Sequence, residues 1–204
     1  MTGSFTDLFL SYLKEYGVIG FCGHICDKLR WLINKRKFGK VGLHTFFQSP
    51  YVLTGEKHIS IGNNVTARKR LQLEAIDRHN GMEFSPEIII GDNVSINFDV
   101  HIGAINKIII EDGVLIASKV FITDHSHGEA NSENFNIPPK NRVLYSKGIV
   151  HIKKNVWIGE GVVILPNVTI GENVIVGANS VVTKSIPDNC VVAGNPARII
   201  KNCK

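Results

Sequence analysis

Hydrophobic residues recur every six positions along one long stretch, VHIKKNVWIGEGVVILPNVTIGENVIVGANSVVT, from Val150 to Thr183. One register holds an aliphatic residue at every step: Ile152, Ile158, Ile164, Ile170, Val176 and Val182. A second register, two positions earlier, holds Val150, Val156, Val162, Val168 and Val174. Glycine and asparagine return between them. Neither the period of 3.6 of a helix nor the alternation of a plain strand produces this pattern.

A period of six is explained if each repeat is one short strand and one bend, and if three repeats close one triangular coil. The aliphatic residues then point into the prism, and glycine and asparagine occupy the corners, where a positive φ costs them little. Stacked coils pair each strand with the strands above and below, and they bury a continuous core. The pattern therefore predicts a mainly β protein, a parallel β-helix.

The segment 1–40 has a different period and is predicted to be a helical region that precedes a repeat domain over 41–204. Its apolar residues fall at helical spacing, with a break expected near Gly17 and Gly20. They are Leu8, Phe9, Tyr12, Leu13, Tyr16, Ile25, Leu29, Leu32 and Ile33. Basic residues flank this apolar face. The helix either lies on an anionic membrane surface or packs on the body of its own or a neighbouring subunit.

Two segments interrupt the repeat. It begins imperfectly around Ile59, and the turn-rich segment 77–86 is predicted to leave the coil. The longer polar segment 124–148 is predicted to be a protruding loop, and a long loop in a regular solenoid is usually functional. A tail, 184–204, ends the chain, and Pro187 and Pro196 are expected to block further coils.

Composition adds few constraints. The net charge of +5 permits anionic partners, but the basic residues are scattered, which argues against nucleic acid. No segment is long and apolar enough to span a bilayer, and no signal sequence is recognised, so we expect a cytoplasmic protein. The four cysteines, Cys22, Cys26, Cys190 and Cys203, form no zinc motif and are expected to be buried free thiols in a reducing compartment.

The long loop opens with the candidate chemistry, Asp124-His125-Ser126-His127. An imidazole titrates near neutrality and can take a proton from an attacking hydroxyl, and Asp124 can fix its tautomer. The spacing does not decide between His125 and His127 as the base. Asn97 and Asp99 lie near one corner of an earlier coil, where they serve either turn geometry or a hydroxyl-rich ligand.

Two features could hold a cofactor that carries phosphates. Trp157 interrupts the small and aliphatic pattern of the repeat, so it either covers a neighbouring surface or forms an aromatic wall for a ligand. Lys184, Arg198 and Lys201 could meet phosphates at the end of such a track.

Together, the sixfold repeat, the Asp-His-Ser-His loop and the ending VVAGNPARIIK make the chain resemble the hexapeptide-repeat acyltransferases. Within them it looks most like the O-acetyltransferases of bacterial surface-polysaccharide synthesis. The resemblance implies a left-handed parallel β-helix, an exception to the usual crossover rule, assembled as a homotrimer. It implies that acetyl-CoA lies between adjacent subunits and that each site combines residues of two chains.

The resemblance also implies roles for individual residues. The family's catalytic histidine falls on His125, and its acceptor-binding segment falls on Asn97, Phe98 and Asp99, with His127 nearby. Its cofactor-contacting positions fall on Trp157, Ala178, Thr183, Lys184 and Arg198. No metal is expected. The implied acceptor is a sugar or glycan, free or lipid-linked, which would place the enzyme in the cytoplasm or on the inner face of the cytoplasmic membrane.

In the expected reaction, His125 draws the proton from an acceptor hydroxyl as its oxygen attacks the thioester carbon, and coenzyme A leaves. Three alternatives stay open. An amino sugar could be the acceptor, which would give N-acetylation. The chain could be a zinc carbonic anhydrase of the same fold, with its zinc ligands drawn from His101, His125, His127 and His151. It could also be a solenoid without enzyme activity.

Overall fold

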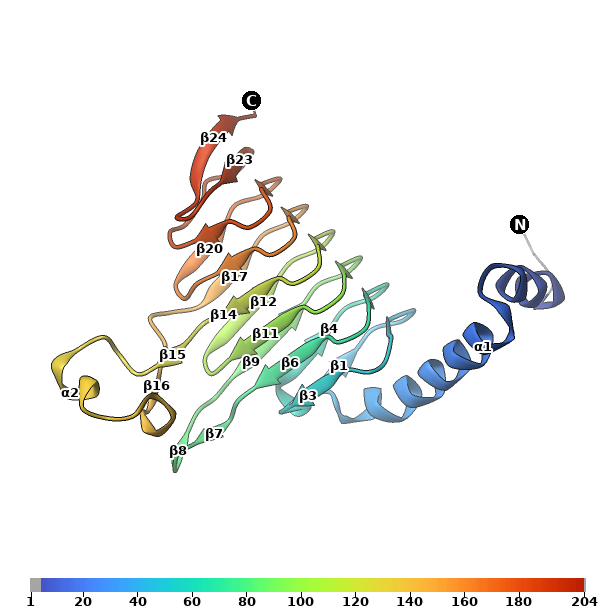
Figure 1. Ribbon diagram of the computed structural model, residues 1–204, viewed down its shortest axis with the longest axis horizontal. Coiled ribbons are helices and arrows are strands. Elements are labelled where there is room, and N and C mark those ends of the chain that lie inside the picture. The colour runs from blue at the N-terminus through green and yellow to red at the C-terminus, as the bar shows by residue number, and fades with distance from the viewer. Residues whose placement is uncertain (1–4, 204) are drawn as a thin grey trace.

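The computed structural model describes the backbone of residues 5–203 and the side chains of residue 14 and residues 17–203. Three parallel sheets form the walls of a prism, and successive strands of the chain lie on successive walls (Figure 1). Residues one coil apart stand in register, as Ile108 does with Ile88 on one side and Val150 on the other. The predicted left-handed parallel β-helix of hexapeptide repeats is confirmed.

Each wall is made of short strands. Sheet A contains β1 (Lys40–Val41), β4 (Ile59–Ile61), β9 (Glu87–Ile90), β12 (Lys107–Ile110), β17 (Val150–Ile152) and β20 (Val168–Ile170). Sheet B contains β2 (Phe46–Phe47), β5 (Thr66–Ala67), β10 (Ser95–Ile96), β13 (Leu115–Ile116), β18 (Trp157–Ile158), β21 (Ile175–Val176), β23 (Cys190–Ala193) and β24 (Arg198–Asn202). Sheet C contains β3 (Val52–Thr54), β6 (Gln72–Ala75), β11 (His101–Ala104), β14 (Phe121–Thr123), β19 (Val163–Ile164) and β22 (Val181–Val182).

The aliphatic registers fill the prism as the repeat predicts. Every residue of both sixfold registers is at most 1% exposed. Burying each such side chain contributes about 1.5–3 kcal/mol. The corners carry the positive φ angles: Asn155, Asn173 and Asn179 have φ of 57°, 56° and 58°. Corner amides also stack, since Asn155 Nδ2 donates to Asn173 Oδ1 at 3.3 Å.

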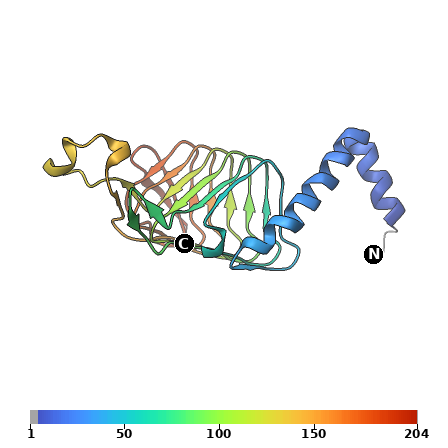
Figure 2. The same cartoon turned by 90° about the horizontal axis from the view of Figure 1, so that it is seen from below.

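Helix α1 (Phe5–Asn34) precedes the prism and extends away from it (Figure 2). Its backbone leaves helical geometry at Gly17, with φ 66° and ψ 177°, so the predicted break is confirmed there. A short 3₁₀ turn, η1 (Lys35–Lys37), leads to β1. The predicted apolar side chains before Gly17 lie outside the described side chains.

The last turns of α1 pack on the first coil. Trp31 is 3% exposed, its Nε1 donates to the carbonyl of Thr45 at 2.6 Å, and its ring centroid lies 4.4 Å from that of Phe47. Asn34 Nδ2 donates to the Tyr51 hydroxyl at 3.0 Å. This end of α1 therefore packs on its own subunit and covers the open end of the apolar core.

Two excursions leave the carboxyl edge of sheet C and contact each other. The segment 77–86 forms a hairpin of β7 (Arg78–His79) and β8 (Met82–Glu83). The loop 124–148 contains β15 (Ser126–His127), α2 (Ser132–Phe135), η3 (Pro139–Asn141) and β16 (Leu144–Tyr145). Asn80 Nδ2 donates to the Lys140 carbonyl at 2.9 Å. Both excursions interrupt the repeat at the positions that the sequence indicates. A further 3₁₀ turn, η2 (Glu56–His58), precedes β4.

The expectation that Pro187 blocks further coils is wrong, and so is the expectation that all four cysteines are buried. β23 adds a strand to sheet B after Pro187. Gly171 holds the equivalent position one coil earlier, and its N–H donates to the Ile186 carbonyl of the next coil. An N–H at Pro187 would likewise point to a following coil, and among the described residues no coil follows there, so the proline removes no hydrogen bond. The antiparallel strand β24 then ends sheet B. Only Cys190 is buried, because α1 turns Cys22 and Cys26 outward and Cys203 follows β24. Within the described residues, no helix is long and apolar enough to cross a bilayer.

Candidate active site

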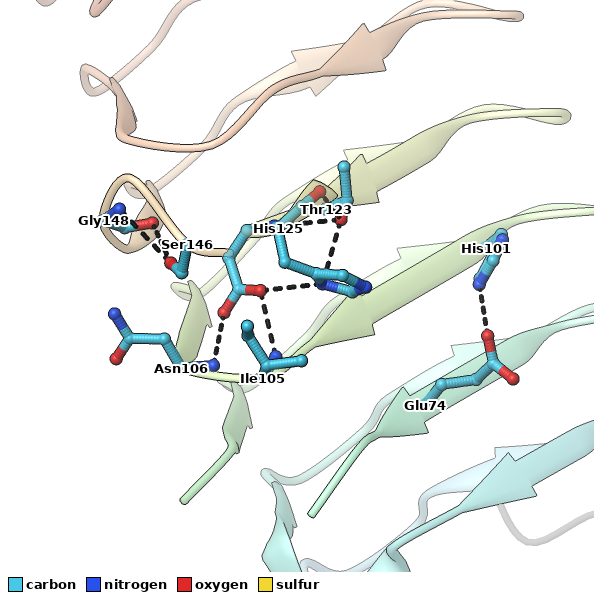
Figure 3. Close-up of polar contacts among 9 residues, drawn as sticks. Glu74, His101, Ile105, Asn106, Thr123, His125, Ser146 and Gly148 are labelled. Carbon is cyan, nitrogen blue, oxygen red and sulfur yellow. Dashed lines mark hydrogen bonds and ion pairs between the residues drawn. The ribbon is translucent and has the colours of Figure 1, made fainter. Parts of the chain in front are cut away.

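The candidate site is built where the chain leaves β14 at the carboxyl edge of sheet C (Figure 3). Asp124 is fully buried. Its two carboxylate oxygens accept backbone N–H groups from the corner one coil earlier, Ile105 at 3.0 Å and Asn106 at 2.9 Å. Stacking of the coils therefore supplies the donors that a buried carboxylate requires. These backbone hydrogen bonds alone fix the orientation of the carboxylate.

His125 is oriented through its Nδ1 atom. Nδ1 lies 3.0 Å from Asp124 Oδ1 and 3.2 Å from Thr123 Oγ1. The Thr123 hydroxyl directs its single proton to the His125 carbonyl, so towards the ring it is an acceptor. With two acceptors facing Nδ1, we assign the proton of the neutral ring to Nδ1. Nε2 is left with its lone pair free, as a general base requires.

Gly103 leaves the space that the His125 ring occupies. A Cβ at Gly103 would lie 3.4 Å from His125 Cε1, so the ring rests over β11 where no side chain intervenes. Sequence reasoning missed both Gly103 and Thr123. The signals were present, since Gly103 takes an outward position beside aliphatic neighbours and Thr123 directly precedes the Asp-His pair.

His127 faces a different surface. It lies on β15, is exposed, and its ring centroid is 5.7 Å from that of His79 on the hairpin. The structure brings Asp124 and His125 together and directs His127 to the contact between the two excursions. The geometry therefore favours His125 over His127 as the base.

The segment from Asn97 to Asp99 lies at the amino edge of sheet C, before β11 begins. Asp99 has φ 59° and forms a bidentate ion pair with Arg70, with 2.7 Å between Asp99 Oδ2 and Arg70 Nη2. The hydrogen bond from Arg70 is the main reason that the pKa of Asp99 is lowered. Phe98 is 37% exposed, with the Arg70 guanidinium 6.0 Å from its ring centroid. In this chain Asp99 is engaged by Arg70, which leaves Asn97 as the freer polar group.

The expected cofactor positions are divided between sheet B and the two edges of sheet C. Trp157 projects from sheet B and is 50% exposed, and Ala178 is exposed at the amino edge. Thr183 and Lys184 are exposed at the carboxyl edge, after β22. Lys184 and Arg198 line one groove of about 400 Å³. Two cations in one groove suit the phosphates of a coenzyme A thioester, and the exposed indole suits an apolar or aromatic part of it.

A single chain does not bring all these residues together. Because the strands of sheet C are parallel, Asn97 and Ala178 stay at one edge of that wall and His125 and Lys184 at the other. The two sets therefore lie at opposite edges of sheet C.

The four histidines considered for zinc do not converge on one point in a single chain. His101 on sheet C is bound to Glu74, and His151 on sheet A is bound to Glu111, each at 2.7 Å. Within the described residues, no group of three or more potential metal ligands gathers.

Comparison with known proteins identifies the family of this chain. Residues 149–184 match the family model "Bacterial transferase hexapeptide (six repeats)". WbbJ of Escherichia coli (strain K12), whose name assigns it provisionally to lipopolysaccharide biosynthesis as an O-acetyl transferase, is 40% identical over 95% of this chain and 94% of its own length.

Two solved structures share the fold. A Vibrio cholerae hexapeptide-repeat acetyltransferase in complex with acetyl coenzyme A has a TM-score of 0.61 and 27% identity, over 87% of this chain and 78% of its own. A mutant of AntD, a Bacillus cereus N-acyltransferase, in complex with dTDP-4-amino-4,6-dideoxyglucose and coenzyme A, has a TM-score of 0.67 and 27% identity, over 86% and 89%. With a relative 40% identical over nearly its whole length, the chain belongs to the hexapeptide-repeat acetyltransferase family and is an enzyme.

Proposed function

We propose that the protein transfers the acetyl group of acetyl-CoA to a hydroxyl of a sugar in lipopolysaccharide or capsular polysaccharide biosynthesis. One observation carries the mechanism: the contacts of His125 Nδ1 with Asp124 and Thr123 leave Nε2 as a free base. The similarity to WbbJ supports the choice of a hydroxyl and of a polysaccharide precursor as acceptor.

In this mechanism His125 Nε2 accepts the hydroxyl proton as the oxygen attacks the thioester carbon. Buried Asp124 stabilises the imidazolium that forms, because its carboxylate already accepts two backbone N–H groups and needs no reorganisation. The proton then passes to the departing thiolate of coenzyme A. Attack is direct, and the only buried thiol among the described cysteines, Cys190, lies in β23, away from His125.

The active form in this proposal is a homotrimer. Its support is the separation of the expected residues, since His125 and Lys184 lie on one edge of sheet C and Asn97 and Ala178 on the other. Acetyl-CoA would lie between two chains, with its phosphates near Lys184 and Arg198. Trp157 would cover the cofactor from the neighbouring wall.

The product distinguishes this proposal from N-acetylation, the reaction class named for AntD. We expect wild-type enzyme, acetyl-CoA and a panel of free, nucleotide-linked and lipid-linked sugars to yield an acetylated sugar, detected by mass spectrometry. Mild alkali should remove the acetyl group, because esters hydrolyse far faster than amides. An alkali-stable product formed only from amino sugars would favour N-acetylation. A tightly bound zinc ion with carbon dioxide hydration, and no acetyl transfer, would favour a carbonic anhydrase.

We also propose that α1 holds the enzyme on the inner face of the cytoplasmic membrane, near a lipid-linked acceptor. Helix α1 exposes Ile25, Leu29 and Leu32, with exposed fractions of 40%, 57% and 49%. Lys28 and Arg30 flank these residues and are exposed. Exposed apolar side chains with cations beside them in sequence favour contact with anionic lipid.

Vesicle sedimentation tests this role. Wild-type protein should sediment with vesicles that contain anionic phosphatidylglycerol, and less so at high salt, since each basic residue contributes about 1 kcal/mol near such a surface. The triple variant Ile25→Glu, Leu29→Glu, Leu32→Glu should stay in the supernatant. A control outside α1 is Val52→Glu, which places one negative charge, against the three of the triple variant, on a 50% exposed residue of β3. Equal sedimentation of the triple variant and the wild type would refute the anchor.

A further inference from the structure

A second histidine and carboxylate pair lies beside His125 on the outward face of sheet C. His101 Nε2 is 2.7 Å from Glu74 Oε2, and the two side chains come from adjacent strands, β11 and β6. Both are about one third exposed, His101 at 35% and Glu74 at 33%. The pair is therefore accessible to a ligand, unlike Asp124.

Gly103 joins this pair to the catalytic histidine. In the register of sheet C, Gly103 stands between Glu74 and Thr123, and His101 stands next to Phe121. A Cβ at Gly103 would lie 3.4 Å from His125 Cε1 and 3.6 Å from His101 Nε2. Both rings therefore border the same small space above Gly103. Figure 3 shows the unbound edge of the His125 ring directed towards the side on which His101 lies.

The carboxylate of Glu74 can still accept a hydrogen bond from a ligand. Among the described residues, Glu74 binds His101 through Oε2, and no contact of its Oε1 atom is seen. The ring of His101 packs on Phe121, with 5.0 Å between the centroids, which fixes its plane. A carboxylate oxygen that is fixed and partly exposed is a strong acceptor for a ligand hydroxyl. Phe121 adds an apolar surface of the kind on which the C–H face of a sugar ring packs.

We propose that Glu74 and His101 form a recognition site for the acceptor, in which Glu74 accepts a hydrogen bond from a second hydroxyl of the sugar that His125 deprotonates. This inference rests on the proposed function. It names the substrate class further: a neutral sugar unit with a free hydroxyl beside the one that is acetylated. A sugar whose carboxylate falls at Glu74 would be repelled. Glu74 and His101 touch the acceptor in this account but move no proton in the reaction.

Kinetics of Glu74→Ala test the recognition role. Loss of a hydrogen bond to a charged group predicts an acceptor KM about 10- to 100-fold higher, with the KM for acetyl-CoA unchanged. The chain offers a matched control, because Glu111 and His151 form a pair at the same 2.7 Å distance on sheet A. Glu111→Ala should leave both KM values unchanged. An unchanged acceptor KM in Glu74→Ala would overturn the inference and leave the proposed function intact.

A deoxy acceptor separates recognition from a merely structural role. Removal of the neighbouring hydroxyl should cost the wild type about 10- to 100-fold in kcat/KM and cost Glu74→Ala little more, since the partner is already gone. If Glu74 only tied two coils together, the deoxy acceptor would lose the same factor with both enzymes. That result would overturn the inference.

Binding gives a readout that needs no turnover. With ¹³C-labelled histidine, the Cε1 resonance of His101, assigned from His101→Gln, should shift on titration with methyl β-galactoside, methyl β-glucoside or methyl β-N-acetylglucosaminide. The resonance of His151 should not move. Failure of all three glycosides to shift His101 would overturn the inference, whether or not the enzyme turns over. Shifts without acetyl transfer would support the recognition site and count against the proposed function instead.

Discussion

Replacement of His125 by alanine should lower kcat by about 10²- to 10⁴-fold, the usual contribution of a positioned general base. The reason is specific to this geometry, since the Nδ1 contacts at 3.0 Å and 3.2 Å leave only Nε2 for the hydroxyl proton. Affinity for acetyl-CoA, measured by calorimetry, should be retained, because His125 contributes to the reacting centre and not to the groove of Lys184 and Arg198.

The control for this variant is His127→Ala. His127 packs near His79, away from the Asp124 carboxylate, so its removal should leave kcat within about threefold of wild type, as expected for a residue outside the chemistry. Thiol release in the presence of acceptor measures both variants. The assignment fails if His125→Ala keeps its turnover or if His127→Ala alone abolishes it.

Asp124→Asn should have the second large effect. The buried carboxylate accepts from three donors: the Ile105 and Asn106 N–H groups and His125 Nδ1. An asparagine would direct an NH₂ group at one of them and favour the wrong tautomer or orientation of His125. We expect kcat to fall by about 10²- to 10⁴-fold, as for other carboxylates that orient a catalytic histidine. The mismatch of buried donors should also cost about 1–3 kcal/mol of stability.

Asp112→Asn is a matched substitution. Asp112 also sits at a corner and accepts a backbone N–H, that of Asp92 at 2.9 Å, but it faces no catalytic group. Its pKa is lowered, mainly by that hydrogen bond, so it too is a carboxylate that the fold stabilises. Thermal unfolding should shift in both variants, whereas turnover should collapse only in Asp124→Asn. Turnover near the wild-type value in Asp124→Asn would remove the orienting role.

Most of the fold could be predicted because burial depends only on position within the six-residue repeat. Ile152 and Val156 are buried and Asn155 forms a corner, and the position of each within its own repeat is enough to predict this. The extra strand β23 was missed because a proline at position 187 removes a hydrogen bond only if another coil follows to accept it. The sequence does not display that relation.

The site was only half predictable for a similar reason. The Asp-His pair stands out along the chain, but its support comes from stacking: Asp124 meets the N–H groups of Ile105 and Asn106 one coil away. The pairing of Asp99 with Arg70 and of His101 with Glu74 also joins residues of adjacent coils. The number of residues per coil varies with each excursion, so these neighbours follow only from the folded register.

We propose that each transfer site is built from the carboxyl edge of one chain and the amino edge of another. Two inactive variants test it, His125→Ala at one edge and Ala178→Trp at the other, where Ala178 is exposed and its replacement would obstruct the cofactor. Mixed oligomers, isolated through a different tag on each variant, should recover acceptor-dependent thiol release, because some of their interfaces pair two native edges. Mixed oligomers as inactive as either parent would contradict a site shared between chains.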